Sequence, residues 1–157
     1  MLSRRFLPIV VFVLATVPLS PARDLAVISN KSNALATISV PDLVKICKAQ
    51  NSRWPDGKPV TFVMRPPSDP QMKFFLEKVY AMSEAEVRGL IATSNHARGT
   101  QPAILIVTSD EELVNRVASL PGSVGVVDVY SINSSVAVVK VAGKLPLEPG
   151  YLLHASQ

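Results

Sequence analysis

The sequence predicts a three-layer α/β domain with a mixed sheet, because short apolar runs alternate with segments that carry helix-capping patterns. The predicted strands are valine-rich or alternate apolar and polar residues, whereas apolar residues recur every three or four positions in the segments between them. Such an alternation is typical of a sheet that helices cover on both faces. The last two predicted strands follow closely in the chain and could pair as an antiparallel hairpin, which would make the sheet mixed.

The first 22 residues have the pattern of a cleavable secretory signal peptide. Arg4 and Arg5 form a positive start, an apolar run of about twelve residues follows, and Ser20-Pro21-Ala22 offers small residues for cleavage after Ala22. The apolar run is shorter than the ~20 residues that a membrane span needs. We therefore expect residues 23–157 to form a single domain that works outside the cytoplasm, in the periplasm.

The exported part carries little net charge. The chain has 16 Lys and Arg and 12 Asp and Glu; Arg4 and Arg5 leave with the signal peptide, so 14 basic residues face 12 acidic ones, a net charge of +2. No basic cluster with interleaved aromatic residues predicts nucleic-acid binding. Cys47 is the only cysteine, so no internal disulfide can form, and its helical spacing with Leu43 and Ile46 favours a buried thiol.

The domain is predicted to open with a strand and a capped helix. Residues 25–28 form a short apolar run that ends in a polar stretch at 29–33, which indicates a buried strand entering a loop. Ser39 can cap a helix that has Pro41 in its first turn and apolar residues along one side.

A strand, a loop and a second helix follow. Trp54-Pro55-Asp56-Gly57 predicts a turn, and the alternation of apolar residues over 60–64 predicts a strand with Arg65 at its end. After the loop at 66–70 the apolar period changes to that of an amphipathic helix, which carries Met72, Phe75, Leu76 and Val79.

Two further helices are predicted from capping boxes. Ser83 and Glu86 start one helix, which the polar stretch at 94–99 is expected to break. Ser109 and Glu112 start the other, after an apolar, extended segment at 103–107.

The chain is predicted to end in two strands and an irregular tail. Residues 123–129 and 136–141 are valine-rich and joined by a polar loop. The prolines at 145–151 exclude a regular element there, so this tail should pack along the surface.

Four pieces of the chain follow one pattern in order. They are residues 40–47 with Trp54-Pro55-Asp56-Gly57-Lys58, Arg65 with Ser68 and a helix bearing Phe74 and Phe75, residues 102–117, and Pro121-Gly122-Ser123-Val124-Gly125. Together they resemble the phosphate-type solute-binding family (PstS-like), especially its short periplasmic members, although Cys47 and Val126 replace usual aromatic residues. The resemblance covers most of residues 23–157.

The resemblance implies a periplasmic-binding-protein-like domain that binds phosphate or a similar oxyanion and works with a membrane transporter or another periplasmic protein. In that family the ligand lies between two lobes and is held by backbone N–H groups, hydroxyls and an arginine. Arg65 and Ser68 are the first candidates here, with Asp69 beside them and Ser29 and Asn30 reaching in from the loop after the first strand. Helix N-termini and arginine both favour anions.

Two departures leave an alternative open. Where the family has Ser-Gly-Thr, this chain has Ser68-Asp69-Pro70; the carboxylate could repel an anion and the proline lacks an N–H donor. Ser68 or Asp69 could instead simply cap a helix with Pro70 near its first position, leaving Arg65 as a solvated charge. The exported part is also about one lobe long. The alternative function is a ligand-free accessory or interaction protein on the same fold.

No pattern predicts catalysis, a metal site or a cofactor. His96 and His154 are expected on the surface, and no pair has zinc-site spacing. The carboxylates at 110–112 fall in the first turn of a predicted helix, where they complement its dipole. Trp54 either anchors its turn against the core or serves a partner surface.

Overall fold

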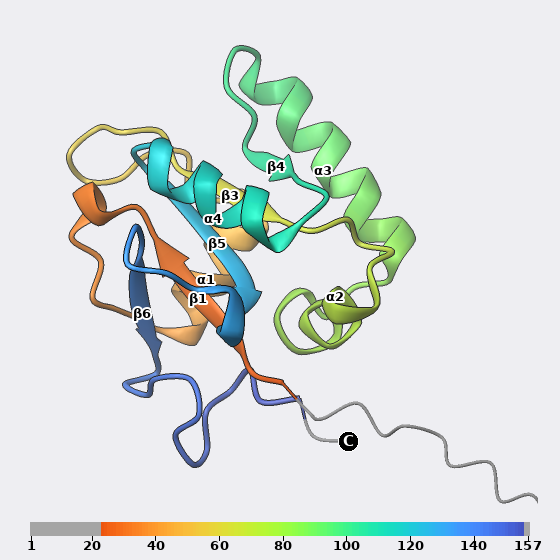
Figure 1. Cartoon of the computed structure of the whole chain (residues 1–157). Helices are drawn as coiled ribbons and strands as arrows, with labels where there is room; N and C mark the ends of the chain where they lie inside the picture. The colour runs from red at the N-terminus through yellow and green to blue at the C-terminus, as the bar shows by residue number, and fades with distance from the viewer. Residues whose placement is uncertain (1–22, 156–157) are drawn as a thin grey trace, which may run out of the picture.

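The computed structural model describes residues 23–155, so the predicted signal peptide at residues 1–22 lies outside the described part. Figure 1 shows one sheet surrounded by helices. Its strands are β1 (Leu25–Ser29), β2 (Thr37–Ile38), β3 (Thr61–Met64), β4 (Ile104–Ile106), β5 (Ser123–Asp128) and β6 (Ala137–Val141). The α-helices are α1 (Val40–Cys47), α2 (Pro70–Phe75), α3 (Glu84–Arg98) and α4 (Asp110–Ser119). None of the helices within 23–155 is long and apolar enough to cross a membrane.

The sheet is mixed, as predicted, but for a different reason. Its strand order is β2-β6-β1-β5-β3-β4, and β1 runs antiparallel to both of its neighbours while the other pairs are parallel. The prediction that the last two strands form a hairpin is therefore wrong, because β1 lies between β5 and β6. The connecting segment crosses one face of the sheet, where Ile132 and Val136 pack with the side chains under α4.

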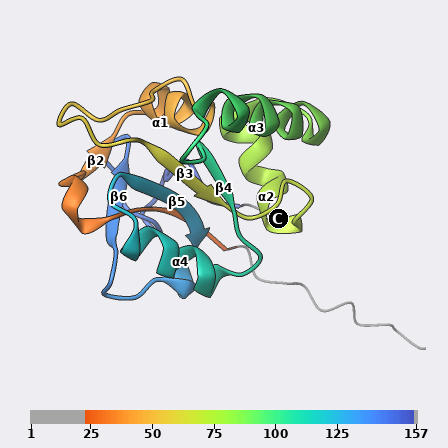
Figure 2. The same ribbon diagram turned by 90° about the horizontal axis from the view of Figure 1, so that it is seen from above.

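Two apolar clusters, one on each face of the sheet, hold the three layers together. Phe62 and Met64 of β3 face the cluster under α1, α2 and α3, whereas Val63 between them faces the cluster under α4. Figure 2 shows α1, α2 and α3 on one side of the strands and α4 on the other. The alternation along β3 explains why every residue of this strand is buried.

The predicted helix starts are confirmed. Ser39 caps α1 and has Pro41 in the first turn, and Ser83 and Glu86 form a complete capping box at α3. Ser109 caps α4, but the Glu112 carboxylate accepts its bonds from the backbone N–H and hydroxyl of Thr108 rather than from Ser109. In the second predicted capping box, the glutamate therefore bonds to the residue before the N-cap and not to the N-cap itself.

The predicted break at residues 94–99 is wrong, since α3 continues to Arg98 and ends at Gly99. The side-chain amide of Asn95 donates to the Ile104 carbonyl and accepts from the Ile104 N–H, both at 2.9 Å. These two bonds to β4 satisfy the side-chain amide of Asn95, so it does not compete for the backbone hydrogen bonds of its own helix and the helix continues.

Two segments differ from the expected regularity. The helix after Arg65 is α-helical only to Phe75 and continues as a π-helical turn, η2 (Leu76–Tyr80). The tail at 145–151 contains no helix or strand and lies on the surface up to Gly150, as predicted, whereas Tyr151 and, beyond that range, Leu153 are buried in the core. The Tyr151 hydroxyl donates to the Leu25 carbonyl at 2.8 Å, which ties the tail to β1.

Candidate functional site

The candidate site lies at the edge of the sheet where β3, β4 and β5 end. These strands are parallel, so their carboxyl ends meet at one edge. Two helices also begin there, α2 after β3 and α4 after β4. In open α/β sheets, ligands bind outside the carboxyl ends of the strands, where helix N-termini present free N–H groups.

Arg65 is the central cation of this edge. Its Nη1 lies 2.9 Å from Asp110 Oδ1 and its Nη2 lies 2.6 Å from Asp69 Oδ2. The exposed fraction of the side chain is 20% for Arg65, 19% for Asp110 and 15% for Asp69, so both ion pairs are shielded from solvent. The Nε atom of Arg65 is buried and has no hydrogen-bond partner within residues 23–155. The alternative prediction of a solvated charge is therefore wrong for Arg65.

Both carboxylates also serve a second element. Asp69 caps α2, since its Oδ1 accepts from the Gln71 N–H at 2.9 Å with Pro70 at the first helical position. Asp110 stands in the first turn of α4, as predicted, and its Oδ2 accepts from the Ser131 hydroxyl at 2.9 Å. The carboxylates occupy the positions at the helix N-termini that favour negative charge.

The sequence did not predict that Asp110 and Ser131 belong to this cluster. A usable indication exists for Asp110, because it opens a helix shortly after a parallel strand, as Asp69 does. Nothing marks Ser131, which arrives from the segment that crosses the sheet after β5.

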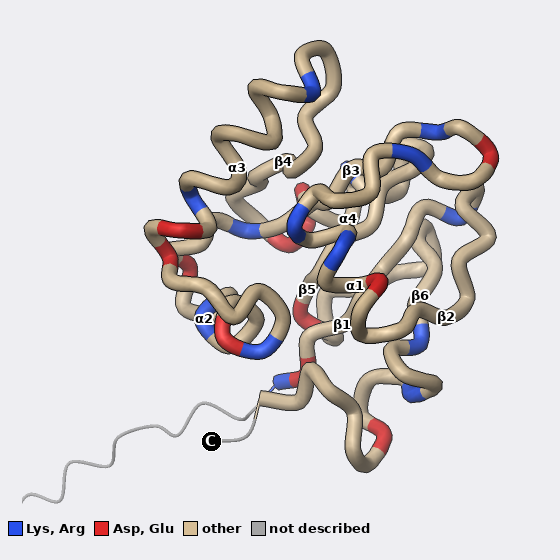
Figure 3. Tube along the Cα trace, turned by 180° about the vertical axis from the view of Figure 1, so that it is seen from behind, with Lys and Arg blue, Asp and Glu red and all other residues tan. Residues whose placement is uncertain are grey.

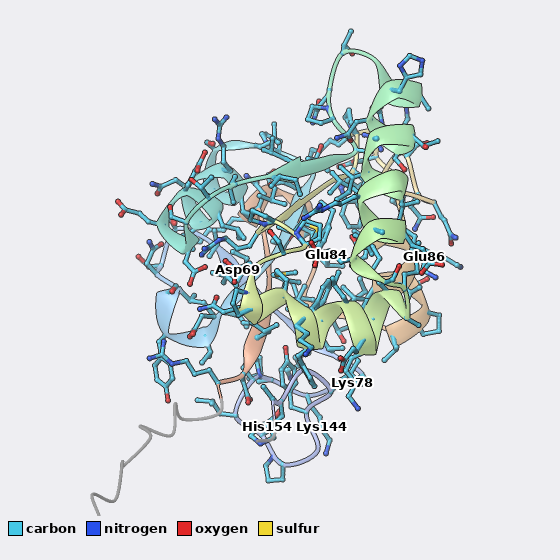
Figure 4. All side chains as sticks on the ribbon, turned by 90° about the vertical axis from the view of Figure 1, so that its right-hand side faces the viewer. Asp69, Lys78, Glu84, Glu86, Lys144 and His154 are labelled. Carbon is cyan, nitrogen blue, oxygen red and sulfur yellow. The ribbon has the colours of Figure 1, made fainter. Side chains whose placement is uncertain are left out.

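Ser68 lies at the same edge but makes no ion pair or side-chain hydrogen bond within the described residues. Its side chain is exposed and lines an open cavity of about 520 Å³ between the starts of α2 and α3, together with Asp69, Lys73, Glu77, Ser83 and Glu84. Figure 4 labels Asp69 and Glu84 at these two helix starts. Three carboxylates and one ammonium group line this cavity, so it is acidic.

Ser29 and Asn30 lie at the opposite edge of the sheet. Ser29 pairs with Val124, which pairs with Phe62, and Phe62 precedes Arg65 by a strand distance of ~10 Å. The amide of Asn30 donates to the carbonyls of Val117 and Ala118, at 2.9 and 3.0 Å. The structure therefore does not bring Ser29 and Asn30 to Arg65, because β1 runs antiparallel to β5. Asn30 instead holds the end of α4, and the Ser29 hydroxyl bonds to Asn30 and Asn33 in its own loop.

The remaining reactive side chains have structural roles. Cys47 is fully buried, and burial raises the pKa of its thiol well above the usual range. The Trp54 indole donates to the Gly122 carbonyl at 2.8 Å, which confirms that it anchors its turn. His96 and His154 are exposed, and His154 Nδ1 contacts the buried Asp24 carboxylate. Residues 23–155 contain no group of three or more potential metal ligands.

No model of a protein family matches this chain, and no curated protein matches its sequence. Solved structures do match its fold. The chain is similar to an ABC-type phosphate transport receptor from Vibrio cholerae, with a TM-score of 0.64 and 19% identity over 80% of this chain and 48% of the receptor. It is also similar to PstS from Borrelia burgdorferi, with a TM-score of 0.65 and 15% identity over 86% of this chain and 55% of that protein.

A phosphate-binding protein from Stenotrophomonas maltophilia matches with a TM-score of 0.59 and 21% identity, over 80% of this chain and 40% of that protein. The chain thus spans about half the length of the solved structures that it matches. The predicted α/β fold of the periplasmic-binding-protein type is confirmed, and the resemblance inferred from the four sequence pieces is supported at the level of the fold.

Proposed function

We propose that the chain is an extracytoplasmic solute-binding-like protein that recognises phosphate or a related oxyanion at Arg65. One observation carries this proposal: Arg65 lies between the starts of α2 and α4, and its buried Nε–H has no partner within residues 23–155. A buried donor without a partner is unfavourable, and an anion oxygen would satisfy it. The shared fold with proteins described as phosphate-binding supports the same ligand class.

The two carboxylates determine which oxyanions fit. Arg65 with Asp69 and Asp110 has a formal charge of −1, so a fully deprotonated anion is repelled at this edge. Hydrogen phosphate carries its own O–H group, which can donate to a carboxylate oxygen, whereas sulfate has none at neutral pH. We therefore expect phosphate to bind more tightly than sulfate. Binding should also be weak, because an anion must compete with Asp69 and Asp110 for the N–H groups of Arg65.

The proposed role is binding for uptake or sensing, not catalysis. The predicted signal peptide at residues 1–22 would place the domain in the periplasm, where a membrane transporter is the partner that the fold suggests. Phosphate would be the cargo, and no cofactor is required.

Calorimetric titration of the domain starting at Arg23 with phosphate, sulfate and molybdate tests the proposal. We expect phosphate to bind with a Kd of about 0.1–1 mM and sulfate more weakly. Arg65→Ala should abolish binding. If this variant fails to fold, Arg65→Lys takes its place; it keeps the charge and should weaken binding. If a folded domain binds none of the three anions at about 10 mM, the proposal is wrong.

A second candidate function is a ligand-free interaction protein on this fold. The observation that favours it is that both Nη atoms of Arg65 already contact carboxylates, which take the place of a bound anion. Affinity capture from the periplasm with the tagged domain distinguishes the two functions. A stoichiometric protein partner together with no anion binding supports this candidate, and anion binding by the isolated monomer contradicts it.

A further inference from the structure

A second cavity lies at the edge of the sheet opposite Arg65. It has a volume of about 570 Å³ and opens between the ends of α1 and α3, beside the segment that precedes β3. Its polar lining includes Ser52, Arg53, Thr93, Ser94, Arg98 and Gln101. Figure 2 shows α1 and α3 side by side on the same face of the sheet. Pockets of this size accommodate small molecules.

The cavity is basic. Arg53 and Arg98 both line it, and no aspartate or glutamate does. Neither guanidinium pairs with a carboxylate in the part of the chain that the structure describes. The acid in the neighbouring turn, Asp56, is held by Lys58 at 3.1 Å. The stretch from Val87 to Ser109 contains no acidic residue, and Figure 3 shows no red segment at the far end of α3.

Backbone contacts hold both arginines in place. Arg53 Nη1 donates to the Gly57 carbonyl at 2.8 Å, and Arg98 Nη1 donates to the Val60 carbonyl at 2.7 Å. Burial lowers the pKa of Arg98, and the repulsion of Arg53 lowers it further. Two guanidinium groups thus share a region whose lining contains no carboxylate, and an anionic ligand would supply the balancing charge.

Hydroxyl groups line the same cavity as the two cations. Within residues 23–155, the side chains of Ser52, Thr93, Ser94 and Thr100 make no hydrogen bond, although Ser and Thr in helices often bond to the preceding turn. Gln101 holds Thr61 through its amide nitrogen at 2.8 Å, which leaves the amide oxygen as an acceptor. No aromatic side chain lines the cavity, so it offers no stacking surface for a nucleobase.

We propose that this cavity binds the phosphate monoester of a small polyol, with Arg53 and Arg98 on the phosphate and the hydroxyl groups on the polyol. The ends of α1 and α3 carry partial negative charge, which opposes an anion, but the two full positive charges of the arginines outweigh it. This site is separate from Arg65 and does not depend on the function proposed there.

Amide NMR titration of the domain starting at Arg23 tests the proposal with three probes: α-glycerophosphate, inorganic phosphate and glycerol. We expect α-glycerophosphate to shift the signals of residues 52–53 and 98–101, inorganic phosphate to bind there several-fold more weakly, and glycerol to cause no shift. Equal affinity for both phosphates would overturn the polyol part of the proposal. Shifts confined to residues 65–69, or no shifts at about 10 mM, would overturn the site itself.

Matched variants assign the two charges. Arg53→Gln and Arg98→Gln should each weaken α-glycerophosphate binding by about tenfold, whereas Arg116→Gln, an equal change of charge at an exposed position on α4, should leave it unchanged. Arg98→Gln loses the contact with the Val60 carbonyl and could destabilise the domain. Arg53 is exposed, so Arg53→Gln should stay folded and still tests the proposal. Unchanged binding by Arg53→Gln, or equal weakening by Arg116→Gln, contradicts the proposal.

Discussion

The two ends of the sheet use arginine in opposite ways. At the carboxyl ends of β3 and β4, Arg65 contacts two carboxylates and is largely shielded from solvent. At the other end, Arg53 and Arg98 line a cavity without any carboxylate and are anchored by backbone carbonyls. Arginine is therefore paired with carboxylates at one end, whereas at the other end it contacts backbone carbonyls and no carboxylate.

The difference predicts that the charges around an arginine, and not its place in a family pattern, determine how easily it binds an anion. Resemblance leads to Arg65, yet an anion that reaches it must compete with Asp69 and Asp110 for the same N–H groups. An anion that enters the opposite cavity competes with no side chain. Affinity at the first site is then limited by the cost of displacing ion pairs.

The largest effect on stability is expected from Arg65→Ala. This change leaves Asp69 and Asp110 facing each other with little solvent to shield them, so the free energy of unfolding should fall by about 3 kcal/mol. Urea denaturation measures it. Arg53→Ala is the control and should change the free energy of unfolding by less than about 0.5 kcal/mol, because this side chain is exposed. Equal losses in the two variants would contradict the contrast between the two ends.

A smaller loss is expected from Gly122→Ala, which acts at the basic end. Gly122 has a φ of +87°, and a Cβ atom there would collide with the Pro59 carbonyl oxygen. We expect the free energy of unfolding to fall by about 2 kcal/mol and the displaced Pro59, which lines the basic cavity, to weaken α-glycerophosphate binding.

Gly57 provides the control for this substitution. It has a similar φ of +91° but open space around it, so Gly57→Ala should cost only about 1 kcal/mol. If both variants lose the same stability and keep the same affinity, the collision with Pro59 does not matter and the link to the cavity is wrong.

Much of the fold could be predicted because its determinants are local. Ser39, Ser83 and Ser109 stand directly before apolar periodic segments, and each caps a helix. Strand neighbours are not local. β5 and β6 are both rich in valine, and nothing in either segment indicates that β1 lies between them. The helical state of Asn95 depends on Ile104 of β4, which a reading of the polar stretch at 94–99 alone does not include.

The candidate site was predictable only in part, for the same reason. Arg65, Ser68 and Asp69 are close in sequence and were found together, and the structure keeps them at one edge. Asp110 lies 45 positions from Arg65. Its place at the start of a helix does not indicate that Arg65 is the residue with which it pairs. Arg53 and Arg98 belong to no motif and come together only through the packing of α1 and α3 against one face.

A moderate gain in affinity is expected from Asp110→Asn. The asparagine keeps the size and the acceptor for Ser131 but removes one negative charge next to Arg65, so phosphate should bind about tenfold more tightly, a change of ~1.4 kcal/mol. Calorimetry measures the affinity. Glu111→Gln is the matched control, because Glu111 is an exposed neighbour in the same helical turn and should change the affinity little. A gain in both variants would indicate a general effect of charge, and no gain in either would mean that Asp110 does not limit binding.

The smallest effect concerns the shape of the cation at the basic end. Arg98→Lys keeps the charge but loses the planar fork, which donates to the Val60 carbonyl and has further N–H groups for the proposed phosphate. We expect Arg98→Lys to bind α-glycerophosphate about threefold more weakly than the wild type does, a change of ~0.6 kcal/mol in binding free energy. Its affinity should lie between those of the wild type and Arg98→Gln. Titration of the three proteins under identical salt conditions measures the order. Because lysine differs from glutamine in charge and from arginine in geometry, a loss equal to that of Arg98→Gln would mean that geometry dominates, and no loss would mean that charge alone holds the ligand. Either result would change what distinguishes this cavity from the edge at Arg65, where both Nη atoms of the fork already contact carboxylates.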